Sequence, residues 1–248
     1  MKNLFFLREY LFPYGCGACG EALLCPEDAY YGLCTPCRLS CESALISSRR
    51  CTICGKKLVS EKEICIDCRG KINNDSGAFN DYLNNIKLLF PYMDKYKKIL
   101  SAYKFRRSIG LGNFFTRCLS IVMSKSDLYM ENAAWVPVPP HPGKIKKQGW
   151  DQVEYLARLL EKDHKHSNIN KLPVLRCLKR LSSRNQKELN RKERETNLKG
   201  KVFCVKKPPK KVIILDDVFT TGATLNACAK TLLEGGAEKV YGVCLFYD

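Results

Sequence analysis

One segment near the carboxyl end of the chain limits its possible folds more than any other. Residues 212–215 are apolar and predict a buried strand, which is followed directly by two acids, Asp216 and Asp217. The residues after them bear hydroxyls or are small, and residues 224–234 then predict a helix. The loop consists of Thr220, Thr221, Gly222, Ala223 and Thr224. A loop at a helix amino terminus presents unpaired N–H groups and the positive end of the helix dipole, so this turn predicts an anion site.

The chemistry of this loop suits a phosphorylated sugar. Gly222 lets the backbone approach a ligand closely, and the threonine hydroxyls add hydrogen-bond donors for a phosphate monoester. The carboxylates of Asp216 and Asp217 can accept hydrogen bonds from the 2- and 3-hydroxyls of a ribose. The alternative is an ordinary turn that caps a helix. We favour a site for phosphoribosyl pyrophosphate or ribose 5-phosphate, because ligands bind at the carboxyl ends of strands in open α/β sheets.

The residues before this segment alternate between strand and helix patterns. We expect strands at residues 86–92, 134–138, 174–178 and 240–246, and helices at residues 94–105, 111–123 and 152–162. Residues 187–197 are polar and fit either a helix or a mobile loop. The alternation predicts an α/β domain with a mainly parallel sheet flanked by helices.

The first 70 residues contain an internal cysteine repeat. Four C-x-x-C pairs occur there, and the two pairs of each copy are separated by 14 residues in the first copy and 10 in the second. The eight cysteines are Cys16, Cys19, Cys34, Cys37, Cys51, Cys54, Cys65 and Cys68. Paired C-x-x-C units are typical of structural zinc sites with four thiolate ligands. The sequence predicts one or two zinc ions and leaves open whether the pairs combine within a copy or across copies.

Residues 69–85 have the polar composition of a linker, which divides the chain into three segments. We expect an amino-terminal helix and a double zinc ribbon in residues 1–70, a linker at 71–85, and the ligand-binding domain at 86–248. No apolar run is long enough for a membrane span, and paired cysteines without a secretory signal indicate a reducing, cytoplasmic compartment.

The positive charge of the chain is concentrated in its second half. The formal net charge is +17, and residues 141–211 contain 21 basic and seven acidic residues. This distribution predicts attraction to phosphate-rich partners. The basic residues could serve pyrophosphate alone, or they could form a groove for single-stranded DNA in which aromatics such as Trp150 and Tyr155 stack on bases.

Several motifs together resemble the ComF family of competence proteins. The segment DDVFTTGAT resembles the phosphoribosyl pyrophosphate motif of type I phosphoribosyltransferases. In the ComF branch a double zinc ribbon precedes such a domain, as the cysteine repeat does here. The segments WVPVPPHPGKIKKQGWDQVEYLARLLEK and SSRNQKELNRKERETNLKGKVF, and the pair Lys104-Phe105, also resemble that family in the expected order. Asp151 stands where the family has asparagine.

The resemblance implies roles for individual residues. Asp216 and Asp217 would hold the ribose hydroxyls, residues 220–224 the 5-phosphate, and Val138, Pro139 and Pro140 the pyrophosphate. Residues 179–197 would cover the ligand, and magnesium would be bound largely by the ligand itself. Apart from the resemblance, the chemistry of transfer needs cations at the leaving pyrophosphate, for which Arg184 and Arg194 are candidates among several basic residues, and a base, for which Glu193 and Asp217 are the candidates.

Three functions follow from these interpretations. The first is a ComF-like competence protein that binds phosphoribosyl pyrophosphate, handles single-stranded DNA during natural transformation and acts with other competence proteins. The second is a phosphoribosyltransferase with a small acceptor and no role in DNA binding. The third, a regulator that senses phosphoribosyl pyrophosphate, would need an output module, and only the zinc repeat could serve as one.

Overall fold

A computed structural model describes residues 15–47, 49–73, 82–124, 132–143, 145, 149–162, 172–181 and 201–248. The expected amino-terminal helix and the polar segment 187–197 lie outside the described residues. So do Arg184 and Arg194. Among the described helices, none combines the length and apolar character needed to cross a membrane.

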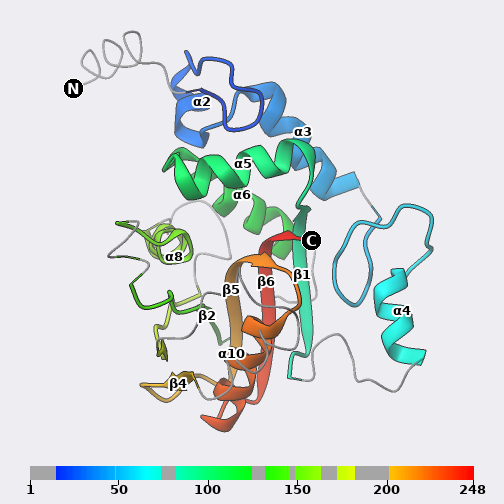
Figure 1. Ribbon diagram of the computed structural model, residues 1–248, viewed down its shortest axis with the longest axis vertical. Helices are drawn as coiled ribbons and strands as arrows, with labels where there is room; N and C mark the ends of the chain where they lie inside the picture. Colours follow the sequence, from blue (N-terminus) through cyan, green and yellow to red (C-terminus); the bar gives the residue numbers. More distant parts are fainter. Residues whose placement is uncertain are drawn as a thin grey trace.

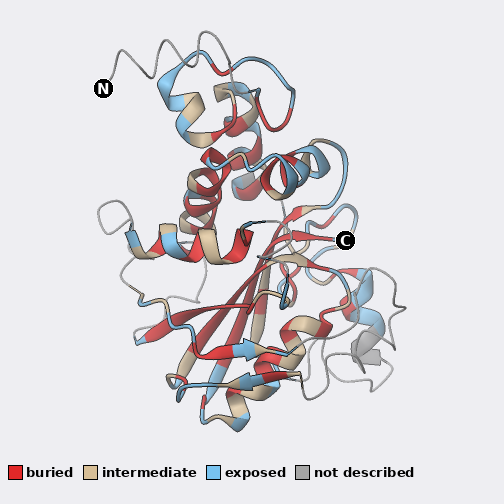
Figure 2. Ribbon diagram, turned by 60° about the vertical axis from the view of Figure 1, so that its left-hand side comes forward, coloured by how far each residue is buried: buried red, intermediate tan, exposed pale blue. Residues whose placement is uncertain are grey.

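Four parallel strands form the centre of the molecule. Their order is β1 (Asn85–Pro91), β6 (Lys239–Tyr247), β5 (Lys211–Phe219) and β2 (Ala133–Pro137). The two central strands are the longest, and their apolar residues are buried on both faces, as expected for a parallel sheet covered by helices (Figure 2). This confirms the predicted α/β class with a mainly parallel sheet.

Helices cover both faces of the sheet. On one face, α10 (Ala223–Glu234) packs on β5 and β6. On the other face lie α5 (Asp94–Phe105), α6 (Gly110–Ser124) and α8 (Gln152–Lys162). Successive side chains of β5 point to opposite faces of the sheet and so contribute to both hydrophobic clusters. Ile213 and Leu215 belong to the cluster beneath α6 and α8. Val212 and Ile214 belong to the cluster beneath α10.

Two strand predictions differ from the structure. The strand predicted at 212–215 extends to Phe219, so Asp216 and Asp217 belong to its end rather than to the loop. The strand predicted at 174–178 is wrong in position. Val174 makes only an isolated bridge to Trp135, and the chain then enters a separate antiparallel pair of β3 (Leu178–Arg180) and β4 (Val202–Cys204). Pro173 cannot donate a ladder hydrogen bond, which is consistent with the brief pairing at Val174.

Each copy of the cysteine repeat packs on a different part of the body. The first copy carries α2 (Pro26–Tyr31) and α3 (Thr35–Ser47), and both helices contact α6. The second copy carries α4 (Ile66–Asn73) and lies beside β1 (Figure 1). There the half-buried Arg50 side chain donates to the carbonyls of Gly55, Leu88 and Leu89 at 2.7–2.9 Å. The bonds to Leu88 and Leu89 connect the second copy to β1, and the bond to Gly55 holds the turn of that copy.

Candidate functional site

A cleft of about 590 Å³ opens at the carboxyl ends of β2 and β5. Its walls include the residues that the sequence proposed for the ribose, the 5-phosphate and the pyrophosphate loop: Asp216, Asp217, Thr220, Thr221, Gly222, Ala223, Thr224, Val138, Pro139 and Pro140. These residues come from two segments about 80 positions apart in the chain, which the parallel pairing of β2 with β5 brings together. The position agrees with the general location of ligand sites in open α/β sheets.

The floor of the cleft is the turn between β5 and α10. Gly222 adopts a left-handed conformation with φ of 82° and occupies the position just before α10. A residue with a side chain would be strained there, so glycine is required by the turn. The Ala223 N–H donates to the Thr221 hydroxyl at 3.4 Å, and the first helical turn follows. The first N–H groups of α10 lack partners within the helix and are available for an anion.

The two acids at the end of β5 have different surroundings. Asp216 is buried, and its Oδ1 accepts a hydrogen bond from the Asp217 N–H at 2.8 Å. The Asp217 carboxylate forms an ion pair with the Lys104 ammonium of α5, with Nζ and Oδ2 2.8 Å apart. Burial by itself would lower the pKa of Lys104, but the Asp217 and Asp216 carboxylates raise it above its ordinary value. Lys104 therefore remains charged inside the cleft.

Two cations lie in the cleft besides the predicted loop residues. Lys104 belongs to the Lys104-Phe105 pair that resembles the ComF family, and Arg180 belongs to the segment 179–197 that was expected to cover the ligand. Arg180 ends β3 and lines the cleft. Its burial lowers its pKa below the ordinary arginine value, and the field of Asp216 acts in the opposite direction. The ion pair of Lys104 with Asp217 follows no local pattern, because α5 and β5 are brought together only by the packing of the helix against the sheet.

Asp151 serves α8 in the structure. Its Oδ1 accepts a hydrogen bond from the Glu154 N–H at 2.9 Å, and the side chain is buried. This is the geometry of a helix N-cap, a position where aspartate and asparagine are nearly equivalent. The neighbouring Trp150 donates its Nε1–H to the Lys104 carbonyl and packs edge-on against Tyr103. Tyr155 packs against Trp150, so both aromatics proposed for base stacking are engaged within the protein.

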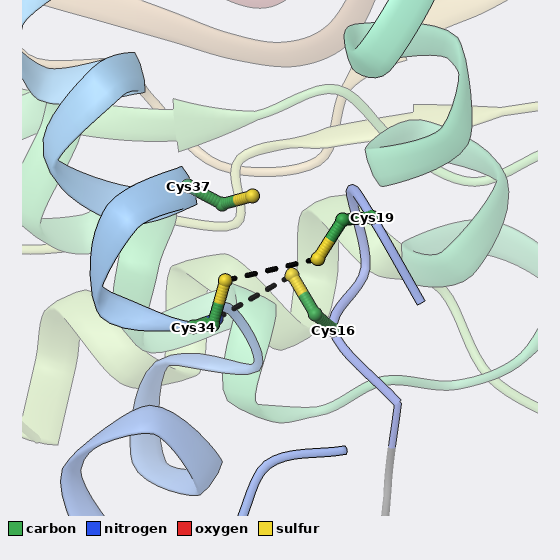
Figure 3. Close-up of side chains that lie close together, drawn as sticks. All are labelled: Cys16, Cys19, Cys34 and Cys37. Carbon is green, nitrogen blue, oxygen red and sulfur yellow. Dashed lines mark hydrogen bonds between the residues drawn. The ribbon is translucent and has the colours of Figure 1, made fainter. Parts of the chain in front are cut away.

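The eight cysteines form two clusters, each within one copy of the repeat. In each cluster the four sulfur atoms all lie within 4.8 Å of one another. Figure 3 shows the first, in which Cys16 and Cys19 from a turn face Cys34 and Cys37 at the start of α3. The alternative of pairing across copies is thereby excluded.

The geometry of both clusters fits zinc. Tetrahedral zinc with bonds of about 2.3 Å would separate its sulfur ligands by about 3.8 Å. The sulfurs of Cys19 and Cys34 are 3.7 Å apart, and those of Cys54 and Cys65 are 3.6 Å apart. In the second cluster the hydrogen bond from Cys68, the largest effect, lowers the pKa of Cys54 to about 6, whereas burial raises the pKa of Cys65 to about 11. Four protein ligands leave no open position, so both sites are structural in character.

The two clusters differ in exposure. All four cysteines of the second cluster are buried, whereas in the first Cys19 is exposed and Cys34 and Cys37 are half-buried. Their hydrogen bonds are otherwise repeated: the Cys34 N–H donates to the Cys16 sulfur and the Cys65 N–H to the Cys51 sulfur, both at 3.4 Å. The internal repeat in sequence is therefore a repeat in structure.

The fold and the clusters define the class of this protein: a mainly parallel α/β domain preceded by cysteine clusters that fit a double zinc ribbon. No protein-family model matches the chain. It is 30% identical over 206 residues to competence protein ComFC of Bacillus subtilis, which covers 79% of this chain and 78% of that protein. It is 29% identical over 209 residues to competence protein ComFC of Streptococcus pneumoniae, covering 84% of each. Competence protein F of Haemophilus influenzae is 24% identical over 217 residues, covering 84% of this chain and 87% of that protein.

These relationships identify the family. The chain belongs to the ComF family of competence proteins.

Proposed function

We propose that the cleft binds phosphoribosyl pyrophosphate with magnesium and that the protein handles single-stranded DNA during natural transformation. One observation carries the ligand assignment. Two carboxylates and a hydroxyl-rich turn at a helix amino terminus line the same cleft. The competence relatives support the biological role. The net charge of +17 supports polyanionic partners.

Different residues of the cleft would contact different groups of the ligand. The N–H groups and hydroxyls of residues 220–224 would take the 5-phosphate, and Asp216 and Asp217 the ribose hydroxyls. The pyrophosphate would lie near Val138 and Pro139, with Lys104 and Arg180 as the nearby cations. Magnesium would be held mainly by the phosphates of the ligand. A volume of about 590 Å³ is in the range of small-molecule sites.

A transferase reaction with a small acceptor is the second candidate function. It would need a group that accepts a proton from the nucleophile, and Asp217 would first have to leave its ion pair with Lys104. Arg184 and Arg194 keep their proposed role at the leaving group. We favour ligand binding coupled to DNA handling because the candidate base is already engaged by a cation.

Replacement of both acids tests the ligand site. Asp216→Ala with Asp217→Ala should abolish calorimetric binding of magnesium phosphoribosyl pyrophosphate and leave the circular dichroism spectrum and zinc content unchanged. A matched control is Glu234→Ala with Glu238→Ala, because those acids are exposed and lie outside the cleft. Normal binding by the first variant, or equal loss in the control, would show that the assignment is wrong.

The DNA function is tested by fluorescence anisotropy with a labelled single-stranded oligonucleotide at several salt concentrations. Salt-sensitive binding near physiological salt would support it. Absence of binding, together with release of pyrophosphate when candidate acceptors are supplied, would instead favour the transferase.

A further inference from the structure

A second hollow of about 530 Å³ adjoins the cleft. It lies between the turn of the first cysteine cluster, residues 16–20, and helix α5, and it shares Tyr92 and Ser101 with the cleft. In Figure 1, α5 lies between the ribbon that carries α2 and the end of the sheet near the carboxyl terminus. The two hollows are thus neighbours along α5, and we call them together the α5 groove.

The α5 groove is positively charged outside the cleft. Lys97, Lys98 and Arg106 line the second hollow and are exposed, and none of the described residues that line it is acidic. A zinc ion with four thiolates would add a net charge of about −2 at one end. The three cations exceed that charge, so the hollow attracts anions even when the cluster holds metal.

Two exposed aromatic rings lie in the same groove. Tyr92 is 41% exposed and Phe105 63% exposed, and both line the cleft. The Lys97 ammonium lies 5.3 Å from the centroid of the Tyr92 ring, so a cation and a stacking surface occur side by side. In contrast, Trp150 and Tyr155 pack within the protein.

We propose that the α5 groove binds a single strand of nucleic acid, with phosphates near Lys97, Lys98 and Arg106 and bases stacked on Tyr92 and Phe105. Cations that follow a backbone, together with exposed rings, are the features by which proteins hold single strands without sequence preference. A duplex keeps its bases stacked on one another and cannot use the rings. The inference rests on the proposed function and deepens it by naming five contact residues, all of which lie outside the basic segment 141–211.

The electrostatic part is tested with paired lysine variants of the full chain. The groove variant is Lys97→Ser with Lys98→Ser, and the matched control is Lys206→Ser with Lys207→Ser, another adjacent and exposed pair. Anisotropy with a labelled oligothymidylate should give about tenfold weaker binding for the groove variant. Each phosphate contact on a single strand contributes about 0.7 to the slope of log affinity against log salt, so the slope should fall by about 1.4. The control should bind as the wild type does.

The stacking part is tested with Tyr92→Leu and Phe105→Leu. Each should weaken oligothymidylate binding by about tenfold with an unchanged salt slope, because stacking does not depend on counterion release. A duplex of the same length should bind more weakly than the single strand and should not respond to these substitutions.

The outcomes separate this proposal from the proposed function. Wild-type affinity in the groove variant, an equal loss in the control, or equal binding of duplex and single strand would overturn the groove assignment and leave DNA handling intact. Failure of the wild type to bind any oligonucleotide would contradict both. The variant Lys97→Ser with Lys98→Ser lies outside the cleft and should still bind phosphoribosyl pyrophosphate as the wild type does, which checks that it folds. Thermal unfolding checks the fold of Tyr92→Leu and Phe105→Leu, because both residues line the cleft.

Discussion

At the scale of single residues, the ion pair between Lys104 and Asp217 decides the electrostatics of the cleft. Both side chains are mostly shielded from water, with 22% and 14% of their surfaces exposed. A shielded pair contributes little net stability as a unit, but removal of one partner leaves the other charge uncompensated. Lys104 therefore compensates the negative charge of two adjacent acids, Asp216 and Asp217, at the end of a buried strand.

A double-mutant cycle tests this role. Lys104→Met should lower the free energy of unfolding by about 1–3 kcal/mol, because the Asp217 carboxylate loses its partner. Lys104→Met with Asp217→Asn should recover most of that loss, because no unpaired charge is left. Urea unfolding of these two variants and of Asp217→Asn gives the three values that the cycle needs. Additive effects of the two substitutions would mean that the pair is not coupled.

The N-cap role of Asp151 gives a second prediction at this scale. Asp151→Ala should cost about 1 kcal/mol of stability, because the Glu154 N–H loses its acceptor. Asp151→Asn should be close to neutral, since asparagine caps helices equally well. Thermal unfolding of the two variants separates them. If asparagine cost as much as alanine, the charge of Asp151 rather than its capping bond would be the important property.

At the scale of elements, the two ribbons are alike in hydrogen bonding but unlike in protection. Both hold a clamp in a turn that ends in a left-handed glycine, Gly20 or Gly55, and both place the second clamp at a helix start. The first ribbon exposes Cys19, and the second buries its whole cluster. Metal loss should therefore begin in the first ribbon.

Chelation kinetics test that order. Zinc release to a colorimetric chelator should occur in two phases of equal amplitude. Cys19→Ser should remove the fast phase, because it opens the exposed site, and Cys54→Ser should remove the slow phase. Zinc content per chain, measured before chelation, serves as the control. A single phase in the wild type, or loss of the slow phase in Cys19→Ser, would contradict the predicted order.

At the scale of the whole molecule, the ribbons and the sheet share their hydrophobic clusters. The cluster beneath α6 includes Leu23 and Leu33 from the first ribbon, and the cluster beneath α10 includes Leu58 from the second. Residues before and after the linker predicted at 71–85 thus pack in the same hydrophobic clusters. The walls of the α5 groove likewise come from the first ribbon, α5 and the sheet.

Truncation tests this dependence. A chain that begins at residue 82 should lose cooperative thermal unfolding or aggregate, because apolar residues of α6 such as Leu111 would lose their cover. The full chain should unfold in one transition that shifts to lower temperature when zinc is removed. A truncated chain with a cooperative transition like that of the full protein would show that the body folds by itself.

Local sequence patterns determined the individual helices, strands and cysteine ligands of this protein. They did not determine which of these elements contact one another in the folded chain. The 3.6-residue period predicted α5 at its observed bounds, and the cysteine spacing predicted the eight cysteine ligands, because both depend on neighbours along the chain. The strand, acids, loop and helix around Asp216 were also readable for that reason. Only the tertiary structure decided that each cluster forms within one copy, that Lys104 pairs with Asp217, and that Arg180 and Tyr92 reach the cleft. These contacts join residues far apart in sequence, and they are set by the packing of helices and ribbons on the sheet, which no short pattern encodes.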